Sequence, residues 1–383
     1  MSVRILHTSD WHLGRVLHSH ALLDDQRHML SQVLDELKSG YDALVVAGDV
    51  FDRAIPSAAA MSLLDDFLNR VCKLDIPVVM IPGNHDSAER LGYGASLFER
   101  HGIHIRCGYA QFMPLTIKGD DGEALDIFTM PFVDHAFVKE ALGDDGIVDK
   151  ESAVKALLDG MRAYRRADVP SMLVTHEFIA GAEESESERV FIGGSHVVPA
   201  SLFDSFAYVA LGHLHKFQPV VGGCRLHYCG SPLAYSFSEA NNRQGMSSVS
   251  ITNGHVEIKQ VSIAPLRKMA ILEDSFESLL ENPVYDRHTG DYVSVRITDE
   301  GHHLNLQARL RERFPHLLET RLCAVERRLQ EDSVMVGTSS DAPAVVFGAF
   351  LDYFKWTVAE ERAEADVLFG KACEAARRME VAQ

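Results

Sequence analysis

Short apolar runs recur along the first part of the chain, and polar residues follow several of them directly. The run Ala43–Ala47 has no polar residue and breaks at Gly48, a pattern typical of a strand buried on both faces. Comparable runs predict further strands at Val3–Thr8, Ile76–Ile81, Ile103–Arg106, Leu125–Pro131, Met172–Thr175, Ala207–Leu211, Leu226–Tyr228 and Ser247–Ile251.

Helical periodicity separates several of these runs. A stripe of leucine and valine residues predicts a helix over residues 21–38. Pro56 predicts the start of a second helix, because proline is favoured in the first turn. A third helix is predicted over residues 152–163. Strands that alternate with helices in this way indicate an α/β protein.

The pattern changes after Pro265. Two predicted strands, Met269–Leu272 and Tyr292–Ile297, alternate with helices near Phe276–Glu281 and Leu304–Arg313. We therefore expect a small second α/β domain. The predicted organisation is a main domain at 1–264, a small capping domain at 265–330, a linker at 331–342 and a helical segment at 343–383.

The C-terminal segment carries two stripes of apolar residues at helical spacing. One contains Phe347, Phe350, Leu351, Phe354 and Val358, and the other contains Leu368, Ala372, Ala375 and Met379. Two interpretations stay open from the residues alone. The segment is either a helical hairpin packed on its own domain or a surface that docks a partner helix.

Composition places the chain among ordinary globular proteins. Its 383 residues are 46% hydrophobic and 24% charged, which suits two or three domains. No long apolar run is visible, and the start of the chain passes directly into a strand pattern rather than a signal peptide. The six cysteines include no Cys-x-x-Cys pair, which argues against a disulfide scaffold or structural zinc and fits a reducing cytoplasm.

The net charge of −18 argues against nonspecific nucleic-acid binding by the whole surface. It does not exclude a local positive groove, especially one whose charge comes from metal ions. Four basic residues beside the polar motifs described below could meet phosphates, which usually receive most protein–DNA hydrogen bonds. They are Arg15, Arg53, Arg90 and Lys216, and ordinary solvated charges are the alternative interpretation.

Candidate metal ligands follow several predicted strands. Asp10 and His12 are two residues apart, so both side chains can face one ion in extended backbone. His213 and His215 repeat this spacing after Gly212. Taken singly, each motif also resembles an ordinary polar strand exit.

Three other strand ends carry similar residues. Asp49 and Asp52 follow the most apolar run, Asn84 and His85 follow Pro82-Gly83, and His176 follows Met172–Thr175. Ligands of open α/β sheets bind outside the carboxyl ends of the strands. We therefore expect these motifs to converge on one site.

Seven of these residues suit two metal ions, with Asp49 shared between them. They are Asp10, His12, Asp49, Asn84, His176, His213 and His215. Carboxylates, imidazoles and one amide suit Mn²⁺, Fe or Zn²⁺ better than calcium or structural zinc. Two divalent ions about 3.5–4 Å apart can clamp a phosphoryl group, and with two ligand carboxylates they leave roughly two net positive charges. Such a site can attract a phosphodiester even to an acidic protein.

The assembled motifs resemble the signature of the calcineurin-like metallophosphoesterases. The shared motifs are Asp10-x-His12, Gly48-Asp49-x-x-Asp52, Gly83-Asn84-His85-Asp86, His176 and Gly212-His213-x-His215. Longer segments are similar to the bacterial SbcD family of nucleases, namely Thr8–Gly14, Gly193-Gly194, Leu211–Lys216, Tyr228–Pro232 and Ser236–Glu239. The similarity is closest over the first 265 residues and weakest in the C-terminal helices.

The resemblance implies a role for each candidate residue. One metal would be held by Asp10, His12, Asp49 and His215, and the other by Asp49, Asn84, His176 and His213. His85 would protonate or stabilise the leaving group. Asp52 would orient His85, because a carboxylate bonded to an imidazole fixes its tautomer.

The same resemblance implies the fold and the activity. The fold would be a sandwich of two mixed β-sheets flanked by helices, with a small α/β capping domain and a C-terminal helical segment. The activity would be an Mn²⁺-dependent DNA nuclease, with 3′–5′ exonuclease action on double-stranded ends and endonuclease action on hairpins or single strands. Such enzymes serve DNA repair and recombination.

The resemblance also implies partners. The expected assembly is a homodimer joined to SbcC, a coiled-coil ATPase, in a heterotetramer at the cytoplasmic nucleoid and away from membranes. The helices after Pro56 and near Gly94 are candidate dimer contacts, although each also looks like a core helix. Residues 345–379 match in position the segment that docks on SbcC.

Two other functions stay open. The first is a calcineurin-like phosphatase or phosphodiesterase with a small substrate, because the metal chemistry is the same. The extra domain and the C-terminal helices favour a macromolecular substrate and a partner over this alternative. The second is a regulatory scaffold without catalysis, against which the complete ligand set and His85 argue.

Overall fold

A computed structural model of the chain describes most of its first 323 residues. The described residues are 2–119, 122–183, 197–220, 223–299 and 303–323, with residues 347, 362, 365 and 367–371. The predicted linker at 331–342 lies outside the described residues, as does most of the predicted helical segment at 343–383.

The chain divides into two compact units. The first contains Met1–Ile271, Asp286–Ser294 and Arg313–Glu319, and the second contains Leu272–Tyr285, Val295–Glu312 and Thr320–Gln383. The chain therefore passes between the units several times. The domain boundary predicted at residue 264 stays a prediction.

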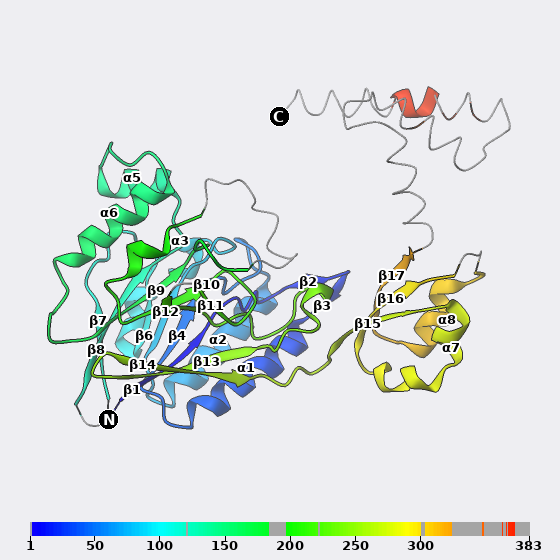
Figure 1. The fold of residues 1–383 in the computed structure, drawn as a ribbon, viewed down its shortest axis with the longest axis horizontal. Helices are drawn as coiled ribbons and strands as arrows, with labels where there is room; N and C mark the ends of the chain where they lie inside the picture. Colours follow the sequence, from blue (N-terminus) through cyan, green and yellow to red (C-terminus); the bar gives the residue numbers. More distant parts are fainter. Residues whose placement is uncertain are drawn as a thin grey trace. The chain divides into compact units, whose positions relative to one another are not determined.

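The first six-stranded sheet has the order β14-β13-β1-β4-β5-β6 (Figure 1). Its strands are β1 (Val3–Thr8), β4 (Ala43–Ala47), β5 (Val78–Ile81), β6 (Ile103–Ile105), β13 (Gly245–Thr252) and β14 (His255–Ser262). β1, β4, β5 and β6 run parallel, whereas β13 and β14 are antiparallel to their neighbours.

The second six-stranded sheet has the order β11-β12-β10-β9-β8-β7. Its strands are β7 (Leu115–Lys118), β8 (Ala124–Met130), β9 (Ser171–His176), β10 (Tyr208–Gly212), β11 (Gln218–Val220) and β12 (Gly223–Tyr228). β8, β9, β10 and β12 are parallel, and β7 and β11 are antiparallel edge strands. Two mixed sheets confirm the predicted sandwich.

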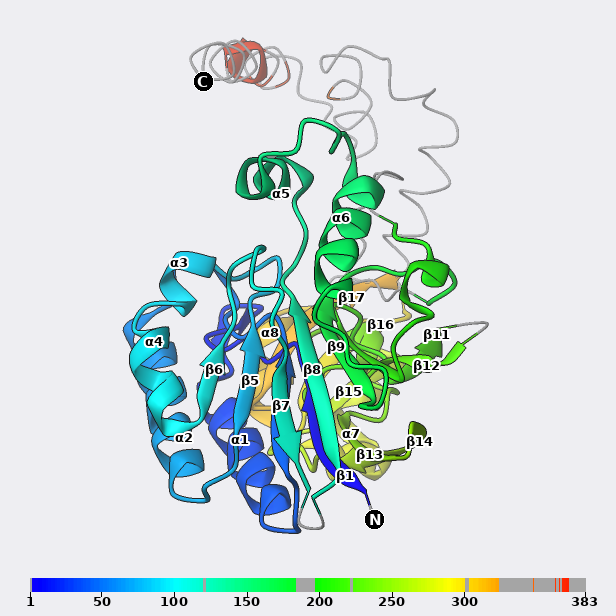
Figure 2. The same ribbon diagram turned by 90° about the vertical axis from the view of Figure 1, so that its left-hand side faces the viewer.

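The two sheets pack face to face, and helices cover their outer faces (Figures 1 and 2). Ile5 and Val45 of the first sheet share one buried cluster with Met172 and Val174 of the second. Helices α1 (Leu23–Leu37) and α2 (Ala58–Cys72) pack on the other face of the first sheet, and α5 (His135–Leu142) and α6 (Lys150–Arg162) pack on the second. The strands are thus covered on both sides, which explains their nearly unbroken apolar sequences.

The remaining elements are smaller. A three-stranded sheet of β15 (Met269–Asp274), β16 (Tyr292–Ile297) and β17 (Leu317–Leu322) accompanies helices α7 (Phe276–Glu281) and α8 (Leu306–Arg313). Short helices α3 (Ala88–Leu91) and α4 (Ala95–Phe98) follow β5, and a two-stranded ribbon joins β2 (Val16–Leu17) to β3 (His20–Ala21).

The sequence pattern did not predict several of the strands, because these strands are only partly buried. β14 is an edge strand in which the exposed residues His255, Glu257 and Lys259 alternate with partly buried apolar ones. Such alternation contains no continuous apolar run, which is the pattern that predicts a buried strand. For the same reason, the sequence pattern did not predict the strands β7, β11 and β17 or the helix α5.

A buried histidine links the two sheets. His7 of β1 is fully buried, and its Nδ1 lies 2.9 Å from the hydroxyl oxygen of Tyr208 on β10. Burial, reinforced by nearby His227, lowers the pKa of His7 to about 3. The folded protein therefore keeps His7 neutral at pH values at which the unfolded chain already binds a proton.

This difference predicts a pH-dependent loss of stability. The contribution of His7 is fully present above the unfolded pKa of about 6.5 and is lost as the pH falls towards about 3. Between pH 7 and pH 5 we expect the free energy of unfolding of the wild type to fall by about 2 kcal/mol more than that of His7→Gln, as measured by urea unfolding. The exposed His255→Gln control should behave as the wild type. Identical pH profiles for the wild type and His7→Gln would contradict the prediction.

Candidate metal centre

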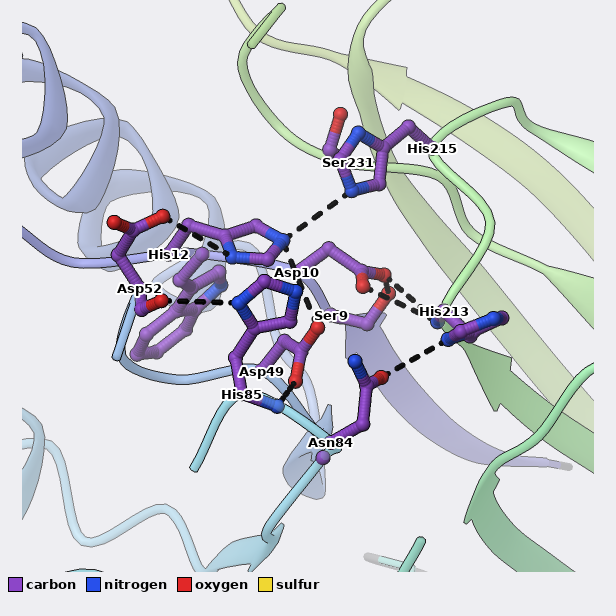
Figure 3. A network of polar contacts seen from close by, with 12 residues as sticks. Ser9, Asp10, His12, Asp49, Asp52, Asn84, His85, His213, His215 and Ser231 are labelled. Carbon is purple, nitrogen blue, oxygen red and sulfur yellow. Dashed lines mark hydrogen bonds and ion pairs between the residues drawn. The ribbon is translucent and has the colours of Figure 1, made fainter. Parts of the chain in front are cut away.

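The carboxyl ends of five parallel strands bring the predicted ligands together. β1, β4 and β5 of the first sheet lead into Asp10, Asp49 and Asn84. β9 of the second sheet ends at His176, and β10 leads into His213. Figure 3 shows that Asp10, Asp49, Asn84 and His213 face a common centre. Residues far apart in the sequence therefore form one site.

Strained backbone places four of the ligands. Asp10, His12, Asp49 and His213 have positive φ angles of 53°, 43°, 50° and 103°. Such conformations cost on the order of 1–3 kcal/mol each and cluster at functional sites. Main-chain bonds hold the turns, because Asp10 N donates to Gly48 O at 3.0 Å and His12 N donates to Asp49 O at 2.9 Å.

Two glycines leave the room that the ligands need. A Cβ atom on Gly83 would overlap the carboxylate of Asp49. A Cβ atom on Gly212 would overlap the carbonyl oxygen of Ala47 and crowd the ring of His176. Because both overlaps involve groups held by the strands, any larger residue would displace the site.

One group of ligand atoms surrounds His12. Single ligand atoms of Asp10, His12 and His215 all lie within 4.8 Å of one another. The Nε2 atoms of His12 and His215 are 3.3 Å apart, and Asp49 Oδ2 lies 3.7 Å from His12 Nε2 (Figure 3). These four residues are those that the resemblance assigns to one metal.

A second group surrounds His176. Its Nε2 lies 3.3 Å from Asp49 Oδ2 and 3.0 Å from Asn84 Oδ1. The same amide oxygen of Asn84 lies 3.0 Å from Nδ1 of His213. Asp49 Oδ2 is thus close to both groups, as expected of a ligand shared by two ions. Asp10 also reaches this group, with Oδ1 at 4.0 Å from His176 Nε2.

Burial makes these charges interact strongly. Asp10 and His176 are fully buried, and Asp49 is nearly so. Burial raises the pKa of Asp10. Burial alone would also raise that of Asp49, but His176 and other imidazoles hold the pKa of Asp49 well below its usual range. For His176, the two carboxylates outweigh burial and raise its pKa to about 9.

The donor set fits divalent metal ions. Buried carboxylate oxygens, imidazole nitrogens and an amide oxygen point at one another, and most of these atoms are acceptors when the histidines are neutral. Acceptors collected in a buried site require a cation to satisfy them. No thiolate contributes to the groups found among the described residues, so the set suits Mn²⁺, Fe or Zn²⁺.

Residues behind the ligands orient two of the imidazoles. His176 Nδ1 lies 2.8 Å from the carbonyl oxygen of Ala47, and His215 Nδ1 lies 3.0 Å from Glu239 Oε1. The other carboxylate oxygen of Glu239 accepts a bond from Tyr235 N at 2.9 Å. Each contact directs Nε2 towards the centre. Glu239 belongs to the motif Ser236–Glu239, but its spacing from the histidine motifs gives no sign of this contact.

His85 lies beside the first group, with its ring 4.8 Å from that of His12 between centroids. Its main-chain N donates to Asp49 Oδ1 at 2.9 Å. Its Nδ1 lies 3.0 Å from the main-chain carbonyl oxygen of Asp52 (Figure 3), whereas we expected the carboxylate of Asp52 to orient the ring. That carboxylate accepts a bond from Arg15 Nη1 at 2.8 Å, and one of its oxygens also lies within 4.8 Å of a ring nitrogen of His85.

A buried ion pair that the sequence analysis did not single out supports the second group. Lys150 Nζ lies 2.6 Å from Glu177 Oε2, and both side chains are almost completely buried. The ammonium also lies over the ring of Phe132, 4.1 Å from its centroid, and Phe132 stacks against His213. The pair therefore packs helix α6 against the ligand loop of the second sheet.

The four candidate basic residues already have protein partners. Arg15 and Arg53 pair with Asp52, Arg90 donates to the carbonyl oxygen of Ala54, and Lys216 pairs with Glu183. Arg53 is largely exposed, with 78% of its side chain accessible. Contact with a phosphate stays a prediction for all four.

Comparison with known proteins assigns the class. The family model described as calcineurin-like phosphoesterase matches residues 3–217, more than half of the chain. The chain therefore belongs to the calcineurin-like phosphoesterase family. A second model, SbcD_C, described as the type 5 capsule protein repressor C-terminal domain, matches residues 265–352. Together the two matches make this chain an SbcD-type metallophosphoesterase.

One similar solved structure is the crystal structure of the protein TT1561 of Thermus thermophilus. It is 13% identical, with a TM-score of 0.36, and the match covers 68% of this chain and 99% of that one. No helix among the described residues is long and apolar enough to cross a membrane.

The contact between Glu239 and His215 predicts an effect on metal binding. Glu239→Gln cannot accept bonds from both His215 and Tyr235 N, so the imidazole loses its orientation and part of its basicity. We expect the dissociation constant for Mn²⁺ to rise by about 10–100-fold in calorimetric titration of metal-free protein. The matched control is Glu257→Gln on the exposed edge strand β14. Unchanged affinity in Glu239→Gln would show that the contact is only structural.

Proposed function

We propose that the chain is the nuclease subunit of an SbcCD-type complex that hydrolyses DNA phosphodiesters with two metal ions. The proposed activities are 3′–5′ exonuclease action on double-stranded ends and endonuclease action on hairpins or single strands, in DNA repair and recombination. The observation that carries this proposal is the shared position of Asp49 between two ligand groups, with His85 beside them. The SbcD-type C-terminal domain supports DNA over a small substrate.

The two groups of side chains described above would supply the proposed metal ligands. Asp10, His12, Asp49 and His215 would hold one ion. Asp49, Asn84, His176 and His213 would hold the other. When bound, two such ions, which we propose are Mn²⁺, would polarise a phosphoryl group and make water more acidic.

The geometry of His85 defines its proposed part in proton transfer. A main-chain carbonyl oxygen only accepts, so Nδ1 of His85 carries a hydrogen and donates it to Asp52 O. Nε2 is then the nitrogen that exchanges a proton with the leaving oxygen. As an imidazolium, His85 would donate that proton, and the neutral ring left behind would accept another. Asp52 thus contributes through its main chain as well as through its bond to Arg15.

An apolar groove beside the site suits the proposed homodimer. It has a volume of about 470 Å³ and is lined mainly by α2 and by the α3–α4 segment. Ile55, Met61 and Tyr93 are 71%, 55% and 84% exposed there, which is unusual for large apolar side chains on a monomer surface. These are the helices after Pro56 and near Gly94 that the resemblance proposes as dimer contacts.

The remaining partners follow from the family. We propose DNA as the substrate and an SbcC-type coiled-coil ATPase as the partner, in a heterotetramer at the cytoplasmic nucleoid. Residues 345–379, the proposed docking segment, lie largely outside the described residues.

The direct test is cleavage of DNA by the purified protein. End-labelled duplex and hairpin DNA would be incubated with Mn²⁺, with and without the SbcC-type partner and ATP, and then with Mg²⁺ alone. We expect Mn²⁺-dependent trimming and hairpin opening that the partner strengthens. No action on DNA, with turnover of small phosphate esters, would instead favour the phosphatase or phosphodiesterase alternative.

The position of His85 predicts separate effects on catalysis and on metal binding. His85→Gln removes proton transfer but leaves every proposed ligand in place, so we expect DNA cleavage to slow by about 10²–10⁴-fold. The dissociation constant for Mn²⁺ should change by less than about twofold, since none of the ligands is lost. The exposed His101→Gln variant is the control. Loss of metal binding in His85→Gln would make this residue structural.

A further inference from the structure

A second cavity lies in the first unit, and the segment that carries Glu239 forms part of its lining. Its volume is about 340 Å³, within the range of pockets that bind small ligands. Residues 233–244 and 262–269 form most of its lining, and Leu22, Asp25 of α1 and Tyr292 of β16 complete it. The cavity uses none of the proposed metal ligands.

The accessible charges of this cavity are positive. Arg243, Arg267 and Lys268 line it, and Arg243 and Lys268 are exposed. Three basic residues meet in one small cavity, whereas the whole chain has a net charge of −18. A concentration of positive charge on an acidic protein attracts anions locally.

The two acidic residues of the lining are committed to other groups. Asp25 Oδ2 accepts a bond from the Tyr292 hydroxyl at 2.7 Å and lies 3.8 Å from Arg267 Nη1. Glu239 is fully buried and bonded to His215 and to Tyr235 N. Neither carboxylate therefore presents an accessible negative charge to a ligand.

An unsatisfied donor also lines the cavity. The side-chain Nε2 of Gln244 is buried and has no hydrogen-bond partner within the described part of the protein. A buried amide donor without an acceptor costs about 1–3 kcal/mol, and a rotation of this side chain towards a ligand oxygen in the cavity would recover that energy. The guanidinium groups and the ammonium of the lining are likewise donors only. The cavity is therefore rich in donors that an anion can satisfy.

We propose that this cavity binds a phosphate group, separately from the metal centre. A phosphate offers several acceptor oxygens and a negative charge, which match the amide of Gln244 and the exposed cations Arg243 and Lys268. The group would belong either to the backbone of a bound nucleic acid or to a free small anion. Glu239, which orients the proposed metal ligand His215, also lines this cavity.

Calorimetric titration of the Mn²⁺-loaded protein with inorganic phosphate tests the proposal. The wild type should bind phosphate both at the metal centre and in the cavity. The double variant Arg243→Glu/Lys268→Glu should weaken the cavity event by at least about tenfold and leave the other unchanged. Gln244→Glu, which replaces the unsatisfied donor with an acidic group of the same size, should weaken the same event.

The controls separate a lost site from a lost fold. Lys38→Glu reverses an exposed charge at the end of α1 and should bind phosphate as the wild type does. Each variant should keep the thermal unfolding midpoint and the Mn²⁺ affinity of the wild type. Phosphate binding in the double variant with wild-type affinity and stoichiometry would overturn the proposal.

A second measurement identifies the source of the phosphate. If it belongs to bound DNA, the double variant should raise the KM for DNA cleavage at least about tenfold more than Lys38→Glu, with kcat retained. If it is a free anion, KM should match that of Lys38→Glu although phosphate binding in the cavity is lost. The phosphate titration needs no nuclease activity, so its outcome is independent of the proposed function.

Discussion

The structure depends on the burial of one carboxylate among imidazoles. Asp49 is almost completely buried, and its Oδ2 lies 3.7 Å from Nε2 of His12 and 3.3 Å from Nε2 of His176. A charge in such a place must be compensated, and here the compensating groups come from both sheets. The register of each strand, the tight turns and the small residues around Asp49 all serve to bring those groups within reach.

That requirement explains why strain collects at the strand ends. Asp10, Asp49 and His213 all have left-handed backbone, and Gly83 and Gly212 lie where no Cβ would fit. The stabilisation from the large buried cores of the two sheets compensates the energetic cost of these conformations. A rigid scaffold with strain concentrated at one edge suits a site that must hold several donors in fixed positions.

Contacts behind the ligands extend the site in two directions. Glu239 joins the metal centre to the donor-rich cavity, since its carboxylate orients His215 and also lines that cavity. On the other side, Lys150 and Glu177 connect α6 to the loop of His213 through Phe132. Both connections involve buried charges whose partners are far away in the sequence.

The amino-acid sequence by itself determined the α/β class, most of the strands and all seven candidate metal ligands. It could do so because buried strands appear in the sequence as continuous apolar runs. A ligand at the end of such a strand then appears as a polar residue directly after the run. Only the tertiary structure decided that the main-chain carbonyl oxygen of Asp52 lies 3.0 Å from His85 Nδ1, and that Glu239 stands behind His215. It also decided which edge strands exist, since β14 is half exposed. The reason is physical: a pattern along the chain reports burial, whereas the choice of partner among buried polar groups depends on distances that arise only when distant segments pack together.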